Sequence, residues 1–141
     1  MMQHKVKVLI VDDNERMRKM VKLYLRGLAD EIRECEDGEQ AFDAYAEFQP
    51  DWVVMDLVME RVDGLTATRR IIATFPDAHI LMVTQYDDIE LRAAAGEAGV
   101  SGYVLKENLL DMQRLLQSPL TQTNTPAVQN ATAQTVMSSC P

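Results

Sequence analysis

The stretch Trp52-Val53-Val54-Met55-Asp56-Leu57-Val58-Met59 decides the fold, because an apolar run ends abruptly in a carboxylate. A short apolar run of this kind is typical of a strand buried on both faces of a parallel sheet. Two other runs have the same form: residues 6–11 lead into Asp12-Asp13, and residues 80–83 lead into Thr84. Ligands of open parallel sheets bind beyond the carboxyl ends of the strands, so these polar residues are predicted to share one site.

Strand-like and helix-like patterns alternate from residue 6 to about residue 117. This alternation predicts an α/β fold with right-handed crossovers and five strand–helix units. The remaining strands are expected near residues 32–35 and 102–105, and Lys106 directly follows the last of them. The predicted site therefore gains an amine beside its carboxylates.

Apolar residues at three- and four-residue spacing predict the inner faces of the helices. The first and last helices are expected to bury Met17, Met20, Val21, Tyr24, Leu25 and Leu28, and Leu109, Leu110, Met112, Leu115 and Leu116, respectively. Asp13 or Asn14 can cap the first helix, and Asp87 or Asp88 the fourth. Gly99 is predicted to end the fourth helix in the left-handed conformation.

Length and charge restrict the classes of function. The chain of 141 residues suits one domain, expected over residues 5–117. Its formal net charge of −8 argues against direct nucleic-acid binding. The two cysteines have no metal-type spacing, and no apolar run is long enough to span a bilayer or to form a signal peptide. We therefore expect a cytoplasmic protein, monomeric or weakly dimeric, without a membrane partner.

The segment 118–141 differs in composition from the rest of the chain. Thr, Gln, Asn, Ala, Ser and Pro dominate it, charged residues are absent after position 120, and no helical or strand period persists. We expect a disordered polar tail.

The five polar residues at the strand ends predict a specific chemistry. Asp12, Asp13 and Asp56 would repel one another unless a cation joined them, and an all-oxygen set suits Mg²⁺ or Mn²⁺. Thr84 and Lys106 could then contact the oxygens of a phosphoryl group that approaches a carboxylate nucleophile. The set therefore predicts phosphorylation of an aspartate.

In the order and type of these residues, positions 5–117 resemble the receiver domains of two-component response regulators, particularly single-domain chemotaxis regulators. The motifs that carry the resemblance are Asp12-Asp13, Asp56-Leu57-Val58-Met59 with Asp63-Gly64, Thr84, Gly102-Tyr103-Val104-Leu105 and Lys106. The resemblance implies a flavodoxin-like sheet of strand order 2-1-3-4-5 with five helices. It also implies a signalling protein rather than an enzyme that acts on external substrates, although such domains promote their own phosphorylation and dephosphorylation.

The resemblance assigns roles to individual residues. Asp56 would accept the phosphoryl group from a histidine kinase or histidine phosphotransfer protein. Asp13, Asp56 and the Val58 carbonyl would hold the metal, with Asp12 acting through water. Thr84 and Tyr103 would form the switch that changes the face of the fourth helix, fifth strand and fifth helix toward a downstream protein partner.

Three residues depart from the family pattern, and no effector domain follows within this sequence. Glu60 and Glu107 stand where the family usually has proline, and Gln85 stands where it usually has a small residue. The bond before residue 107 is commonly cis in the family, and a cis bond before Glu107 would cost about 2.5–4 kcal/mol. The bulky Gln85 side chain is expected to flank the crevice.

Two alternative functions and one alternative role for Tyr103 stay open. Phosphatases with an aspartyl nucleophile usually need a second acid two residues later, where this chain has Val58. A receiver-like binding module that is never phosphorylated is the other alternative, if Gln85 or Glu107 spoils the site. Tyr103 could also be a core aromatic without a switch role.

Overall fold

The computed structural model describes residues 5–117, so the predicted tail 118–141 lies outside the described part of the chain. Five parallel strands form one sheet in the order β2-β1-β3-β4-β5, which confirms the flavodoxin-like topology. The strands are β1 (Lys7–Val11), β2 (Glu31–Cys35), β3 (Trp52–Asp56), β4 (Ile80–Thr84) and β5 (Gly102–Leu105). The helices are α1 (Glu15–Tyr24), α2 (Gly38–Phe48), α3 (Gly64–Thr74), α4 (Ile89–Ala98) and α5 (Leu110–Gln117), with a short 3-10 helix, η1 (Lys106–Asn108), before α5.

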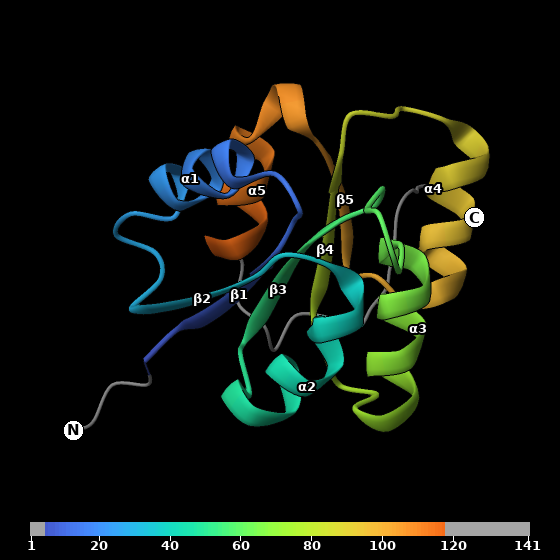
Figure 1. Ribbon diagram of the computed structural model, residues 1–141. Coiled ribbons are helices and arrows are strands. Elements are labelled where there is room, and N and C mark those ends of the chain that lie inside the picture. Colours follow the sequence, from blue (N-terminus) through green and yellow to red (C-terminus); the bar gives the residue numbers. More distant parts are fainter. Residues whose placement is uncertain (1–4, 118–141) are drawn as a thin grey trace, which may run out of the picture.

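The helices cover the two faces of the sheet unequally. α1 and α5 pack on one face, and α2, α3 and α4 pack on the other (Figure 1). Alternate strand residues point to opposite faces, so Val54 and Val83 join the α1/α5 core while Met55 and Met82 join the other. Apolar residues on both faces explain why the central strands read as continuous apolar runs.

The sheet register aligns the carboxyl ends of the strands. Asp56 is opposite Val83 on β4, and Thr84 is opposite Leu105 on β5. The residues that end β3 and β4 and those that follow β1 and β5 are therefore brought to a common edge, as the apolar runs predicted. Among residues 5–117, no helix combines the length and apolar character that crossing a bilayer requires.

The helix boundaries confirm most of the local predictions. Of the paired alternatives, Asn14 caps α1 and Asp88 caps α4 through side-chain oxygens that accept backbone N–H groups. Gly99 ends α4 with φ +105°, the left-handed conformation that favours glycine. Asp63 caps α3, just before Gly64.

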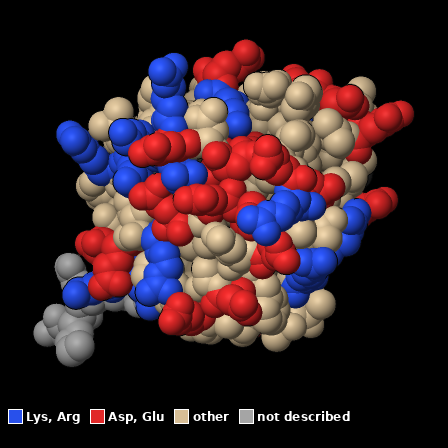
Figure 2. Space-filling model, viewed as in Figure 1, with Lys and Arg blue, Asp and Glu red and all other residues tan. Residues whose placement is uncertain are grey.

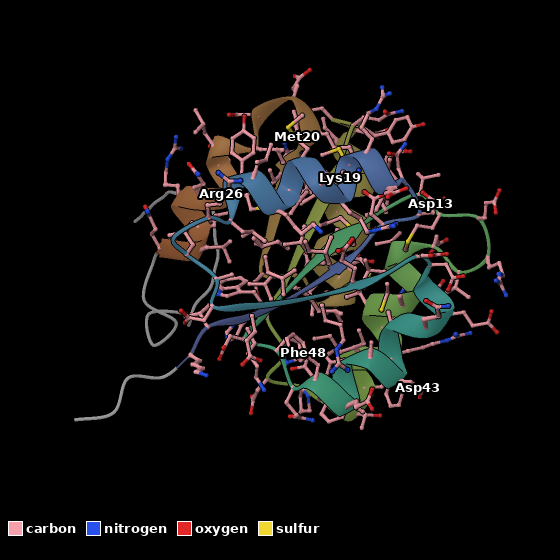
Figure 3. All side chains as sticks on the ribbon, turned by 60° about the vertical axis from the view of Figure 1, so that its left-hand side comes forward. Asp13, Lys19, Met20, Arg26, Asp43 and Phe48 are labelled. Carbon is pink, nitrogen blue, oxygen red and sulfur yellow. The ribbon has the colours of Figure 1, made fainter. Side chains whose placement is uncertain are left out.

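Two predicted core residues are exposed instead. Met20 is 42% exposed and lies on the side of α1 turned away from the sheet (Figure 3). The inner face of α1 is centred on Val21 and Leu25, and the buried Arg18, rather than Met20, completes it. Leu110, the first residue of α5, is 57% exposed, whereas Leu109 and Met112 are buried.

Candidate functional site

The carboxyl ends of the strands bring the predicted acids together. One carboxylate oxygen from each of Asp12, Asp13 and Asp56 can be chosen so that all three lie within 4.8 Å of one another. Asp12 and Asp56 are buried, with 4% and 5% exposure, whereas Asp13 is exposed. Asp13 lies near the start of α1 in Figure 3, and acidic side chains gather in the middle of the face seen in Figure 2. The sequence prediction of a shared acidic site therefore matches the geometry.

Lys106 reaches the same cluster from the other side. Its Nζ lies 3.2 Å from Asp56 Oδ1 and 3.5 Å from Asp12 Oδ2. β5 ends at Leu105, so Lys106, the first residue of the 3-10 turn η1, directly follows the carboxyl end of this strand. No peptide bond in the described part of the chain is cis, so the bond before Glu107 is trans and Lys106 still reaches the acids.

Burial and mutual repulsion raise the pKa values of Asp12 and Asp56. Burial raises the pKa of Asp56 to about 6, the charge of Asp12 adds to the rise, and Lys106 opposes it. Burial also raises the pKa of Asp12, against the opposing effects of the Asn14 backbone N–H and Lys106. One ammonium therefore does not neutralise the three carboxylates. Close oxygen donors with excess negative charge suit a hard divalent cation such as Mg²⁺.

The loop after β3 is held close to Asp56. The backbone N–H of Gly64 donates to the Leu57 carbonyl at 2.8 Å, and Asp63 accepts from Thr66 N–H at 2.8 Å. A Cβ at Gly64 would overlap the carbonyl oxygen of Asp56, so glycine permits this approach. The side chain of Val58 is 55% exposed and supplies no acid.

Tyr86 connects the two predicted switch residues through its main chain. Its backbone N–H donates to Thr84 Oγ1 at 3.3 Å, and its carbonyl accepts from the Tyr103 hydroxyl at 2.7 Å. Thr84 is buried, with 1% exposure, whereas Tyr86 is 43% exposed. Thr84, at the end of β4, and Tyr103, on the neighbouring strand β5, are therefore linked by one residue that the sequence prediction did not include.

The Tyr103 ring is also held from α4. The Arg92 guanidinium lies 4.6 Å from the ring centroid, and its Nε is 2.9 Å from Asp87 Oδ1. A guanidinium over an aromatic face is attracted by the electron-rich ring. The partly buried Tyr103 ring therefore packs against the core on the α2/α3/α4 face and also contacts α4 and the loop after β4.

Arg18 is a second residue that the sequence analysis missed. It is only 9% exposed, and its Nη1 donates to the carbonyl oxygen of Asp12 at 2.7 Å. Its Nε donates to Glu34 on β2, also at 2.7 Å. The sequence did contain a signal for this pairing. Arg18 is a charged residue on the apolar side of α1, and Glu34 on β2 could neutralise it.

A family model, the response regulator receiver domain, matches residues 8–119. This chain belongs to the response regulator receiver family. The receiver domain is 39% identical over 99 residues to the chemotaxis protein CheY of Halobacterium salinarum, which covers 70% of this chain and 82% of that protein. It is 32% identical over 118 residues to the transcriptional regulatory protein DegU of Brevibacillus brevis.

The receiver domain also resembles solved structures. A two-component response regulator of the LuxR family from Aurantimonas sp. SI85-9A1 aligns with a TM-score of 0.71 at 29% identity, over 80% of this chain and 86% of that one. The DegU match covers 82% of this chain but 49% of DegU, so the chain spans about half the length of that relative.

Proposed function

We propose that this receiver domain is a signalling switch in which Asp56 accepts a phosphoryl group from a histidine kinase or histidine phosphotransfer protein. The observation that carries the proposal is the arrangement around Asp56, a buried carboxylate with a cation 3.2 Å away and two further acids beside it. In the reaction, an Asp56 oxygen forms a bond to phosphorus while the donor's phosphorus–nitrogen bond breaks. The electron pair returns to the histidine nitrogen, and the product on Asp56 is a mixed anhydride.

Asp13, Asp56 and the Val58 carbonyl would hold Mg²⁺ or Mn²⁺, with Asp12 acting through a water molecule. When bound, the ion supplies positive charge that offsets the repulsion between the acids and an incoming phosphoryl group. The three close carboxylate oxygens support this assignment. Lys106 contributes its own charge and would transfer its contact from Asp56 to a phosphoryl oxygen.

The switch would begin at Thr84. Its hydroxyl, which now accepts the Tyr86 N–H, would turn to donate to a phosphoryl oxygen. The contacts of Tyr86 and Tyr103 would then rearrange, and the face formed by α4, β5 and α5 would favour a different downstream protein. The hydrogen bond between Tyr103 and Tyr86 supports a coupled response of β5 and the loop after β4.

Several wider properties belong to the same proposal. Residues 5–117 form the receiver domain, which promotes its own phosphorylation and dephosphorylation and has no external substrate. It works in the cytoplasm as a monomer or weak homodimer, and the net charge of −8 supports a protein partner rather than nucleic acid. A phosphatase acting on external esters is less well supported, because the exposed Val58 cannot serve as the second acid.

The proposal is tested by treating the full chain with acetyl phosphate and Mg²⁺ and measuring intact mass. We expect one phosphoryl group on the wild type, placed on Asp56 by peptide mapping, and none on Asp56→Asn or in the presence of EDTA. Equal labelling of wild type and Asp56→Asn would contradict the assignment. A wild type that binds Mg²⁺ but is never labelled would instead indicate a receiver-like binding module.

A further inference from the structure

Arg18 is a buried cation that contacts the main chain of the acidic site. Its guanidinium uses two of its donors in different directions, with Nε toward Glu34 Oε1 and Nη1 toward the Asp12 carbonyl oxygen, each at 2.7 Å. A guanidinium is planar, so the angle between these two bonds is fixed. Arg18 therefore ties α1, the edge strand β2 and the end of β1 together at one point.

Asp12 is held through its backbone N–H, its carbonyl oxygen and one carboxylate oxygen. Its N–H donates to the Cys35 carbonyl of β2 at 3.1 Å, and its Oδ1 accepts the Asn14 N–H at 2.9 Å. Arg18 supplies the third bond, to the Asp12 carbonyl, at the peptide that leads directly to Asp13. The orientation of that peptide determines where both carboxylates point.

We infer that Arg18 is a positioning residue that holds the Asp12-Asp13 segment in the orientation that receives a divalent cation. Glu34 orients the Arg18 side chain and balances its charge. The inference rests on the proposed function, because it concerns the metal that phosphorylation requires. Residues that orient the ligands of a metal site typically change its affinity 10–100-fold when they are replaced.

Geometry and charge make opposite predictions for this residue. If Arg18 acted only through its charge, its removal would leave the site more negative and would strengthen the binding of a cation. If Arg18 acts by holding the Asp12 carbonyl, its removal loosens the acids and weakens the binding. The sign of the change in affinity therefore distinguishes the two roles.

Lys22 offers a matched control. It lies one turn further along α1, and its Nζ contacts the same Glu34 at 2.7 Å, through Oε2. Lys22→Met and Arg18→Met each remove one positive charge next to Glu34, but only Arg18→Met removes a bond to Asp12. If Mg²⁺ affinity depends only on the lost charge or on the weakened ion pairs between α1 and Glu34 of β2, both variants should show the same change.

The experiment measures Mg²⁺ binding by calorimetry and amide exchange of residues 12–14 by NMR in metal-free protein, with no phosphodonor present. For Arg18→Met we expect at least tenfold weaker Mg²⁺ binding and faster exchange of the Asp12 and Asn14 amides, whereas Lys22→Met stays within about twofold of the wild type. Arg18→Lys should resemble Arg18→Met, because an ammonium lacks the rigid planar fork that fixes the angle between the bonds to Glu34 and to the Asp12 carbonyl. Glu34→Gln keeps an acceptor for Nε and should stay near the wild type.

Equal affinity in Arg18→Met and Lys22→Met, tighter binding in Arg18→Met, or full rescue by Arg18→Lys would each overturn the inference. Circular dichroism establishes that each variant is folded. If Arg18→Met is unfolded, Arg18→Gln takes its place with the same expectations. A wild type that binds Mg²⁺ but resists acetyl phosphate would contradict phosphorylation of Asp56 while leaving this test intact, and a wild type without Mg²⁺ binding would overturn the metal role of Arg18.

Discussion

The Lys106 ammonium lies 3.2 Å from Asp56 Oδ1, and yet the pKa of Asp56 is raised to about 6. The cost of burying the carboxylate and its repulsion by Asp12 exceed the attraction of one lysine. At neutral pH the carboxylates of the metal-free site therefore repel one another. A cation that binds there relieves this repulsion, which favours its binding.

The first prediction concerns stability and pH. Because the folded pKa of Asp56 lies above its unfolded value of 3.8, the folded state binds this proton more tightly, and stability is lost as pH rises from about 3.8 through 6. Asp56→Asn should therefore stabilise the metal-free protein at pH 7.5, by about 1–3 kcal/mol. The gain should shrink toward pH 4. Urea unfolding in EDTA at the two pH values measures it.

The exposed Asp43 on α2 provides the control for this experiment (Figure 3). Asp43→Asn should change the unfolding free energy by no more than about 0.5 kcal/mol. A gain for Asp56→Asn that is the same at both pH values, or no gain at all, would show that repulsion around Asp56 is not a significant cost.

Lys106 should be needed for phosphoryl transfer but not for metal binding. Lys106→Met removes a cation that competes with Mg²⁺ for Asp56 and Asp12, so Mg²⁺ should bind as tightly as in the wild type or more tightly. Labelling by acetyl phosphate at saturating Mg²⁺ should slow at least tenfold, since the phosphoryl oxygens lose a charged partner; that corresponds to about 1.4 kcal/mol. Lys19→Met, on the exposed side of α1, is the control. Weaker Mg²⁺ binding in Lys106→Met would contradict this division of roles.

The close approach of Gly64 to Asp56 predicts a position-specific cost of alanine. Gly64→Ala should destabilise the protein by about 3 kcal/mol, the upper end of the overpacking range, because the added Cβ meets backbone atoms that cannot rotate away. Gly96→Ala, in the interior of α4 with no atom within 4 Å of the new Cβ, should stabilise it by about 0.5–1 kcal/mol. Chemical denaturation measures both. Similar values for the two variants would mean that the loop shifts freely.

The hydroxyl of Tyr103 should couple the site to α4 without taking part in the chemistry. Tyr103→Phe keeps the ring under Arg92 but loses the bond to the Tyr86 carbonyl, at a cost of about 0.5–1.5 kcal/mol. The labelling rate of Asp56 should be unchanged, while the NMR shift response of α4 amides to phosphorylation should shrink. Tyr24→Phe on α1 is the control. An undiminished response in Tyr103→Phe would place the coupling elsewhere.

The acidic site was predictable because parallel strands end at one edge, so an apolar run that stops at Asp56 or Asp12 already indicates where the carboxylate lies. Hydrogen bonds made by main-chain atoms cannot be predicted from residue types in this way. Tyr86 joins Thr84 to Tyr103 through backbone atoms that every residue except proline possesses, and its side chain gives no hint of it.

The inner face of α1 shows a different limit. Counting apolar residues placed Met20 inside and ignored Arg18, because the count cannot recognise a cation whose charge is matched by Glu34 on another strand. Leu110 was misplaced because apolar spacing alone did not distinguish it from its neighbour Leu109, which is the buried residue of the two. In both cases the spacing of apolar residues does not determine which side chain the folded chain buries.

If the proposed switch operates, the main chain and the side chain of Tyr86 have separate roles. The proposed relay would use its peptide N–H and carbonyl, which substitution of the side chain leaves in place, whereas its phenol ring is exposed. Related receivers could therefore acquire different partners through this position and keep the same internal connection. A change of the partner bound at this position would therefore leave the hydrogen bonds of Tyr86 to Thr84 and Tyr103 in place.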